Sequence, residues 1–217
     1  MPGPEHELTA RTFDSIIKQK ITDGGQEALI QHMGSTQYDG TYNAKEADAS
    51  FKPLRARPGR LDWPTVILEV GVSEKPRRSS LDAKWWIENS GGAIRVVLLF
   101  FVNLSRKTIR IEMWKKDTID NPQHTRDHNQ QEVTGPTLKQ TINITPTGIT
   151  GAPLVLSFRD IFLRRRKKRR GENNYIITED DIQKFYNLVW LPDVTSESES
   201  SAEEDQSSHS SDNYVVD

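Results

Sequence analysis

The chain has 217 residues, 34% of them hydrophobic, which is enough for one domain with a buried core. It contains no cysteine, which excludes disulfide bridges and thiolate zinc sites and is typical of cytosolic or nuclear proteins. The longest apolar run, residues 96–102, is far shorter than the roughly 18 residues that span a bilayer, and residues 1–7 are too polar for a signal peptide. We therefore expect a soluble globular protein in the nucleus or the cytoplasm.

The formal net charge of -2 conceals an uneven distribution of charge. Residues 193–217 hold eight acidic residues and no Lys or Arg, which leaves residues 1–192 at +6. The cations of this part concentrate in one segment, the basic block: Arg164, Arg165, Arg166, Lys167, Lys168, Arg169 and Arg170. Such a block binds the phosphate backbone of DNA or RNA or an import receptor, and the alternative is a solvated surface loop. We take nucleic acid as the expected partner.

Two helices are expected near the start of the chain. Residues 8–20 predict a helix, because Leu8, Phe13 and Ile17 recur at roughly helical spacing before the Gly24-Gly25 pair interrupts the pattern. Residues 26–33 predict a second, short helix. An extended segment over residues 47–51 follows, with Asp48 on the face opposite Phe51.

The central part of the chain predicts a sheet. Residues 65–72 form a nearly continuous apolar run of β-branched character, as in a strand that is buried on both faces. A helix is expected over residues 81–89, a second buried strand over 94–102, and a strand with one solvated face over 108–114. The order is strand, strand, helix, strand, strand. It predicts an α/β (α+β) fold, with a central mixed sheet of four to five strands flanked by helices.

The remaining residues predict less regular structure and a final helix. Residues 115–151 are polar and rich in Pro and Gly, so we expect long loops with one short strand over 140–144. Thr178 predicts the cap of an amphipathic helix, and Pro192 the end of the domain. Residues 193–217, with eight serines among eight acids, predict a disordered tail. The expected organisation is therefore one domain, 1–192, and a tail, 193–217.

Glu69 is the anomaly of the buried strand, because a carboxylate inside a core costs several kcal/mol unless it is paired or metal-bound. Asp48 and Glu69, on adjacent strands, could hold one Mg²⁺ or Mn²⁺ ion, with the Val70 carbonyl as a third ligand. Such an ion activates water for attack on a phosphodiester. Lys84, on the following helix, is the best-placed ammonium. The alternative is structural: Glu69 forms a buried ion pair with Lys84 or an arginine, and Asp48 caps a turn.

Several segments together resemble a family of uncharacterised fungal proteins that is assigned to the restriction-endonuclease-like PD-(D/E)XK fold. The segments are 46–51 (EADASF), 64–74 (PTVILEVGVSE), 81–86 (LDAKWW), 89–92 (NSGG) and 111–114 (IEMW). The resemblance covers residues 25–192. Their order along the chain is more specific than any one of the motifs.

The resemblance implies a nuclease fold and places its catalytic residues. The superfamily pattern is an aspartate followed by Glu-x-Lys on the next strand, and the matching positions are Asp48, Glu69 and Gly71. The lysine is absent from its usual place, and related nucleases carry it on the following helix, where Lys84 stands; Lys75 is a weaker substitute. Many members add an acid from the first helix, for which Glu5, Glu7 and Glu27 are all open.

The residues and the resemblance predict a Mg²⁺-dependent nuclease with Asp48, Glu69 and Lys84 as catalytic residues. The first alternative is a catalytically inactive nuclease-fold module that binds nucleic acid or a protein partner. A second alternative places the function in the acidic tail, through phosphorylation and interaction sites. The tail could also fold back onto the basic block and compete with nucleic acid. Trp85 and Trp86 are expected in structural roles, with base stacking as the alternative.

Overall fold

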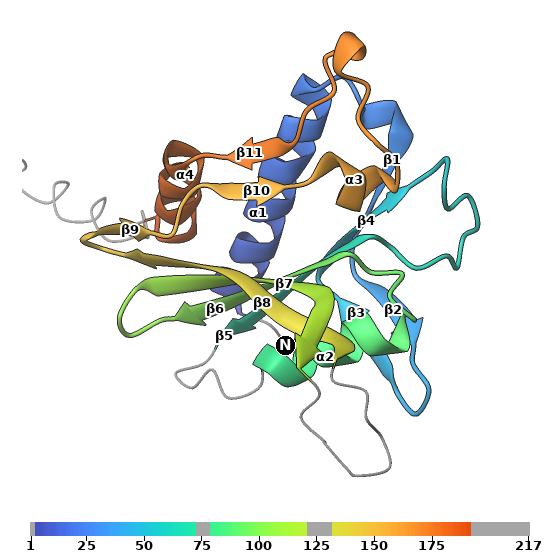
Figure 1. Cartoon of the computed structure of the whole chain (residues 1–217). Helices are drawn as coiled ribbons and strands as arrows, with labels where there is room; N and C mark the ends of the chain where they lie inside the picture. Colours follow the sequence, from blue (N-terminus) through green and yellow to red (C-terminus); the bar gives the residue numbers. More distant parts are fainter. Residues whose placement is uncertain (1–2, 73–78, 121–131, 192–217) are drawn as a thin grey trace, which may run out of the picture.

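The computed structural model describes residues 3–72, 79–120 and 132–191, and its centre is a seven-stranded sheet (Figure 1). The strands lie in the order β1-β4-β5-β6-β7-β8-β9. Their bounds are β1 Ile30–Met33, β4 Ala49–Pro53, β5 Val66–Val72, β6 Val96–Asn103, β7 Thr108–Asp120, β8 Glu132–Thr145 and β9 Gly148–Thr150. In this sheet β5 and β6 are parallel and the other neighbours are antiparallel.

The expected order of elements is confirmed at the middle of the sheet. The predicted strand, strand, helix, strand, strand is β4, β5, α2 (Ser79–Asn89), β6 and β7. Because β5 and β6 are parallel, the chain must cross over between them, and α2 provides that crossover. The predicted class, a mixed sheet flanked by helices, is therefore confirmed, with seven strands in place of four to five.

Helices cover both faces of the sheet (Figure 1). The long helix α1 (Pro4–Asp23) and the final helix α4 (Glu179–Val189) pack together on one face, and α2 lies on the other. The remaining elements are the strand pair β2 (Thr36–Asp39) and β3 (Ala44–Ala47), the pair β10 (Leu154–Leu156) and β11 (Tyr175–Ile177), α3 (Phe158–Phe162), and the 3₁₀ turns η1 (Glu27–Leu29) and η2 (Lys168–Arg170). No described helix is both long and apolar enough to cross a membrane.

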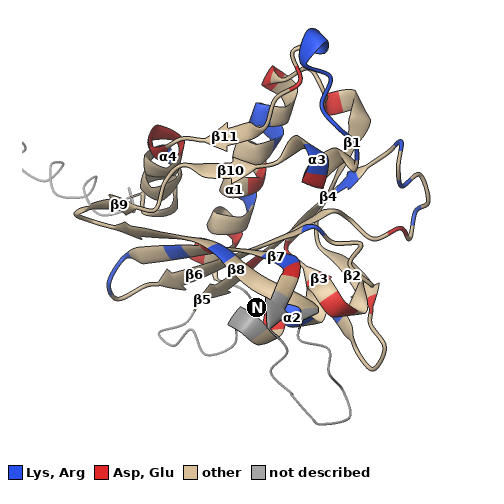
Figure 2. Cartoon of the chain, in the orientation of Figure 1, with Lys and Arg blue, Asp and Glu red and all other residues tan. Residues whose placement is uncertain are grey.

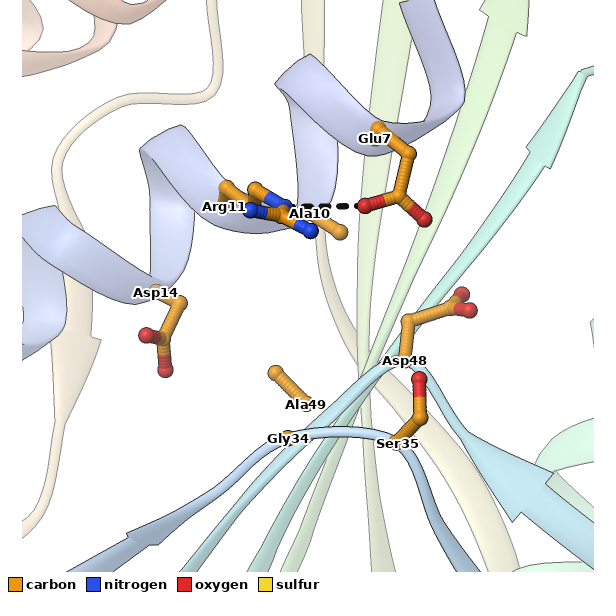
Figure 3. A pocket seen from close by; sticks show the side chains of 8 residues that line it. All are labelled: Glu7, Ala10, Arg11, Asp14, Gly34, Ser35, Asp48 and Ala49. Atoms are coloured by element: carbon orange, nitrogen blue, oxygen red, sulfur yellow. Dashed lines mark hydrogen bonds and ion pairs between the residues drawn. The ribbon is translucent and has the colours of Figure 1, made fainter. Parts of the chain in front are cut away.

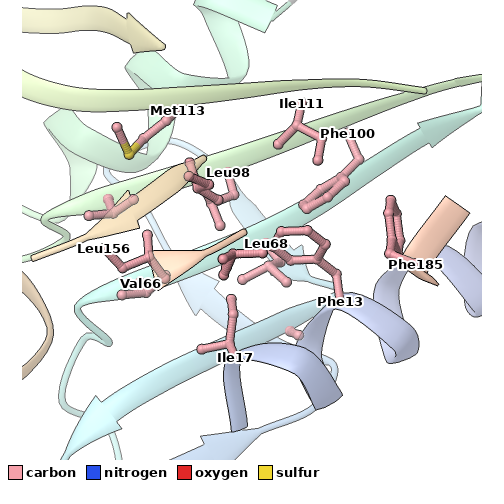
Figure 4. Packing of buried hydrophobic residues seen from close by; sticks show 14 of the residues in the cluster. Phe13, Ile17, Val66, Leu68, Leu98, Phe100, Ile111, Met113, Leu156 and Phe185 are labelled. Atoms are coloured by element: carbon pink, nitrogen blue, oxygen red, sulfur yellow. The ribbon is translucent and has the colours of Figure 1, made fainter. Parts of the chain in front are cut away.

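The larger core lies between the sheet and α1 (Figure 4). Successive side chains of a strand point to opposite faces, so Leu68 and Phe100 join this core while Ile67 joins the smaller core under α2. The Phe13 ring of α1 lies 4.7 Å from the Phe100 ring and 5.2 Å from the Phe185 ring of α4, both edge-on. Side chains from both helices and the sheet thus fix the position of β5 and, with it, of Glu69.

Two expectations near the start of the chain are wrong. Residues 26–33 do not form a helix: η1 is one short turn, and β1 pairs with β4 at the edge of the sheet. Residues 47–51 do not form one strand, because the chain turns at Asp48, between β3 and β4. As a result Ala47 packs under α2 while Ala49 and Phe51 pack under α1.

Residues 115–151 also differ from the expected loops. In the described part of this region, β7 continues to Asp120, and β8 pairs with it over the whole of that length. The ladder of backbone hydrogen bonds between two antiparallel strands needs no apolar side chains, so the polar composition does not reveal it. Residues 121–131 and the predicted tail lie outside the described residues, and so does Pro192.

Candidate active site

Glu69 lies in β5, in the interior of the sheet, with its side chain toward α2. Its side chain is 18% exposed. Oε1 accepts a hydrogen bond from the Trp86 indole N–H at 2.7 Å, and Oε2 lies 3.4 Å from the Lys45 ammonium. Burial raises the pKa of Glu69 to about 7, against the lowering effects of Lys45 and Trp86. Near neutral pH this carboxyl therefore occurs in both its protonated and its ionised form.

The ammonium beside Glu69 comes from Lys45, a residue that the sequence did not single out. Lys45 stands on β3, and its Nζ lies 2.6 Å from Asp82 Oδ1 on α2 as well as 3.4 Å from Glu69 Oε2. It also lies over the rings of Trp85 and Trp86, 5.9 and 5.8 Å from their centroids. The half-buried Lys45 ammonium is thus held by the carboxylates of Asp82 and Glu69 and by the rings of the two tryptophans.

Lys84, the predicted catalytic lysine, lies elsewhere on α2. It follows Asp82 by two residues, about 200° around the helix axis, so its side chain leaves the helix on another side. Its side chain is 55% exposed, and Nζ lies 3.9 Å from Glu88 Oε1. Among the described residues no hydrogen bond or ion pair joins Lys84 to Glu69. The structural alternative named Lys84 or an arginine as the ion-pair partner of Glu69, but among the described residues that partner is Lys45.

Asp48 lies where β4 begins, beside the part of β5 that β4 does not cover. The last paired residues of the two strands are Ala49 and Leu68, and beyond them the Val70 N–H donates to Asp48 Oδ2 at 2.7 Å. The N–H and C=O of one residue in a strand point to the same side, so the Val70 carbonyl is directed toward this gap as well. The sequence-predicted pair Asp48 and Val70 is thus brought together at one end of β5.

His6 of α1 completes the surroundings of Asp48. Its Nε2 lies 3.4 Å from Asp48 Oδ2, which places the Asp48 carboxylate on the α1 side of the sheet and not opposite Phe51 as expected. Burial raises the pKa of Asp48, and the Val70 N–H and His6 oppose this effect. The Asp48 charge in turn contributes to the raised pKa of Glu69. The two carboxylates therefore sense one another, although they approach the end of β5 from different faces.

A small polar pocket of about 220 Å³ adjoins Asp48, between α1 and the sheet (Figure 3). Its lining residues are Glu7, Ala10, Arg11, Asp14, Gly34, Ser35, Asp48 and Ala49. Glu7 and Arg11 form an exposed ion pair at 2.9 Å across one turn of α1. Of the three acids that the resemblance left open, Glu7 of α1 shares this pocket with Asp48. Glu5 of α1 and Glu27, which lies in η1 and not in the first helix, do not line it.

The basic block lies at the other end of β4 (Figure 2). Arg164 is fixed by two hydrogen bonds to Glu172, at 2.7 and 2.9 Å, and by stacking 4.8 Å from the Phe158 ring. These hydrogen bonds lower the pKa of Glu172 to about 2. The other six cations are exposed. Asp48 and Pro53, at the two ends of β4, are about 16 Å apart along the strand, so the block is not part of the carboxylate site.

The two tryptophans of α2 have structural roles. Trp86 is fully buried, packs in the core under α2 and orients Glu69. Trp85 is half-buried, and its N–H donates to Asn43 Oδ1 at 2.5 Å. The prediction of structural roles is in keeping with these contacts. Lys75, the weaker substitute for the missing lysine, lies outside the described residues.

Comparisons with known proteins give a distant likeness to solved structures. No family model and no curated protein matches the chain. Among solved structures, the chain is similar to a protein from Anabaena variabilis described as a "putative nuclease belonging to DUF820", with a TM-score of 0.44 and 10% identity over 86% of this chain and 84% of that one. A likeness this distant does not identify an activity. Resemblance to a fungal family stays a prediction.

Proposed function

We propose that the chain is a divalent-cation-dependent nuclease of the PD-(D/E)XK type. Asp48, Glu69 and the Val70 carbonyl would hold Mg²⁺ or Mn²⁺, and Lys45 would supply the ammonium that the sequence assigns to Lys84. The observation that carries the proposal is the surroundings of Glu69: a buried carboxyl of pKa about 7 in the interior of a sheet, beside one ammonium and two further carboxylates. A structural ion pair between Glu69 and Lys45 would need no further carboxylates, whereas Asp48 and Asp82 also lie near Glu69.

The donor atoms fit a hard cation. Mg²⁺ and Mn²⁺ prefer carboxylate and carbonyl oxygens, and these are the atoms that Asp48, Glu69 and Val70 offer. Oδ1 of Asp48 accepts no hydrogen bond from the described residues, and the contact of Glu69 Oε2 with Lys45 is long at 3.4 Å. The raised pKa of Glu69 shows that its negative charge is incompletely compensated. Within the described residues no cluster of three or more His, Asp or Glu forms a metal site, and the proposed ligand set accordingly consists of two carboxylates and the Val70 carbonyl.

Each residue of the site would contribute a separate step. When bound, the cation would supply an activated water and neutralise charge on the phosphate. The Val70 N–H and the Trp86 N–H hold one oxygen of Asp48 and one of Glu69, which orients both carboxylates. Lys45, held by Asp82, would place its ammonium against the charge that develops on phosphorus. Glu69 would act as a cation ligand through Oε2, because Oε1 is held by the Trp86 N–H.

The basic block would bind the nucleic acid outside the reacting phosphate. Its exposed cations, about 16 Å along β4 from Asp48, would contact phosphates several nucleotides from the cleaved bond. Such contacts make binding strongly dependent on salt and independent of sequence. An import receptor is a second partner for the same block, which would agree with a nuclear location.

Cleavage of labelled single- and double-stranded DNA and RNA with Mg²⁺ or Mn²⁺ tests the proposal. Glu69→Gln, Asp48→Asn and Lys45→Met should lose cleavage and stay folded. Lys84→Met is the matched control, because it removes an ammonium from the same region without touching the carboxylates, and it should cleave like the wild type. Loss of cleavage in Lys84→Met with retention in Lys45→Met would reverse the assignment of the lysine.

A catalytically inactive module that binds nucleic acid or a protein is the second candidate. Gly71 stands where the superfamily carries its lysine, and Glu69 already has two partners from the protein, Trp86 and Lys45. This candidate predicts salt-sensitive binding through the basic block and no cleavage of any substrate with either metal. The cleavage assay therefore separates the two candidates directly.

A further inference from the structure

A second pocket, larger than the one beside Asp48, lies against the basic block. Its volume is about 500 Å³. Apolar groups form part of its lining: Leu29, Pro53, Ala56, Phe162 and Leu163. The other lining residues are four cations, Arg55, Arg164, Lys167 and Arg170, and one acid, Glu172. The size falls within the range of ligand-binding pockets.

The cations of this pocket are not balanced by the acid beside them. Glu172 is buried and is saturated by Arg164 and by the Lys167 backbone N–H at 2.6 Å. Arg55, Arg170 and the Lys167 ammonium have no ion pair among the described residues. Within the part of the chain that the structure describes, the pocket thus presents three unpaired cations around apolar groups. Its chemistry fits a ligand that carries carboxylates or phosphates next to apolar side chains.

A nucleic acid backbone does not supply the apolar part of such a ligand. Leu29, Pro53, Ala56 and Leu163 are aliphatic, and Phe162 is only 4% exposed, so the pocket offers no aromatic face for a base. An acidic peptide with apolar residues would satisfy both the cations and the apolar lining. The chain itself contains one: Asp212-Asn-Tyr-Val-Val-Asp217, at the end of a segment with eight acids and no cation.

We propose that residues 212–217 dock in this pocket, with Tyr214 and Val216 on its apolar lining and the acids of residues 193–217 along the basic block. The segment is long enough. From Gly171 through β11 and α4 to Leu191 the chain spans at most about 45 Å, whereas 21 extended residues from Leu191 to Asp212 reach about 70 Å. Because both partners belong to one chain, the local concentration of the segment is high even if the contact is weak. Docking would cover cations that otherwise bind phosphates.

A spin label gives a direct test in the full chain. Since the chain has no cysteine, Ser211→Cys provides a single attachment site beside the docking segment. At low salt the label should cause loss of the amide signals of Leu29, Ala56 and Leu163, and the signals should return at high salt. The double variant Tyr214→Ser/Val216→Ser should restore them at low salt as well.

Two charge-reversal pairs distinguish docking in the pocket from attraction to the block as a whole. Arg55→Glu/Arg170→Glu changes exposed residues that line the pocket, and Lys168→Glu/Arg169→Glu changes exposed residues of the block that do not. The signal loss should disappear in the first pair and remain in the second. Equal effects of both pairs, or no signal loss in the wild type, would overturn the proposal. The proposal would also be overturned if a single-stranded oligonucleotide shifted the amide signals of the pocket while the spin label on the tail left those signals unchanged. None of these outcomes depends on catalysis, so failure here would leave the nuclease proposal standing.

Discussion

The raised pKa of Glu69 makes the stability of the fold depend on pH in a defined way. In the unfolded chain this carboxyl has its ordinary pKa of 4.5, and in the folded chain its pKa is about 7. The folded state therefore favours the protonated form. The stabilisation is complete below pH 4.5 and is lost as the pH rises through 7. At 1.36 kcal/mol per pKa unit the loss amounts to about 3 kcal/mol.

Glu69→Gln isolates this effect. The glutamine oxygen can still accept the Trp86 hydrogen bond, the volume is unchanged, and the side chain no longer titrates. The free energy of unfolding in urea, measured between pH 4 and pH 8, should fall by about 3 kcal/mol more in the wild type than in the variant. All other titrating groups are common to both proteins, so the difference reports Glu69. Parallel pH profiles would refute the argument that burial keeps this carboxyl protonated.

Further predictions concern the neighbours of Glu69 and the end of the domain. Lys45→Met should raise the pKa of Glu69 further, since the ammonium lowers it, so the stabilisation should be lost at a higher pH in urea unfolding. Lys84→Met should change the unfolding free energy by less than about 0.5 kcal/mol, as expected for an exposed ion pair one helical turn apart. Trp86→Phe removes the hydrogen bond to Glu69 Oε1 and should cost about 1–3 kcal/mol in urea unfolding. Thr178→Ala removes the capping box at the start of α4 and should cost about 1 kcal/mol in thermal unfolding.

The sequence predicts the middle of the fold well because the signals there are local. The apolar run of β5, the capping pattern at the start of α2 and the run of β6 each specify their element, and a helix between two buried strands implies a parallel pair. The anomaly of Glu69 is also visible, since one charged residue interrupts an apolar strand. These inferences need no knowledge of long-range contacts.

The rest of the site depends on contacts between distant residues. Lys45 reaches Glu69 because the β2–β3 pair bends back beside α2, and His6 reaches Asp48 because α1 crosses the sheet. Nothing in the local pattern around Lys45 or His6 marks either residue. Lys84 lies close to Glu69 along the chain, but the direction of a helical side chain changes by about 100° per residue. Proximity in sequence therefore selects a lysine whose side chain leaves α2 on another side than Asp82, the residue that contacts Lys45.

Binding of Mn²⁺, followed by the electron paramagnetic resonance signal of the free ion, tests the central claim most directly, because it does not require a known substrate. The wild type and Lys84→Met should remove free Mn²⁺ from solution with equal affinity, and Asp48→Asn and Glu69→Gln should bind it much more weakly. Equal binding by the wild type and both carboxylate variants, or no binding by the wild type, would contradict a cation site at this end of β5.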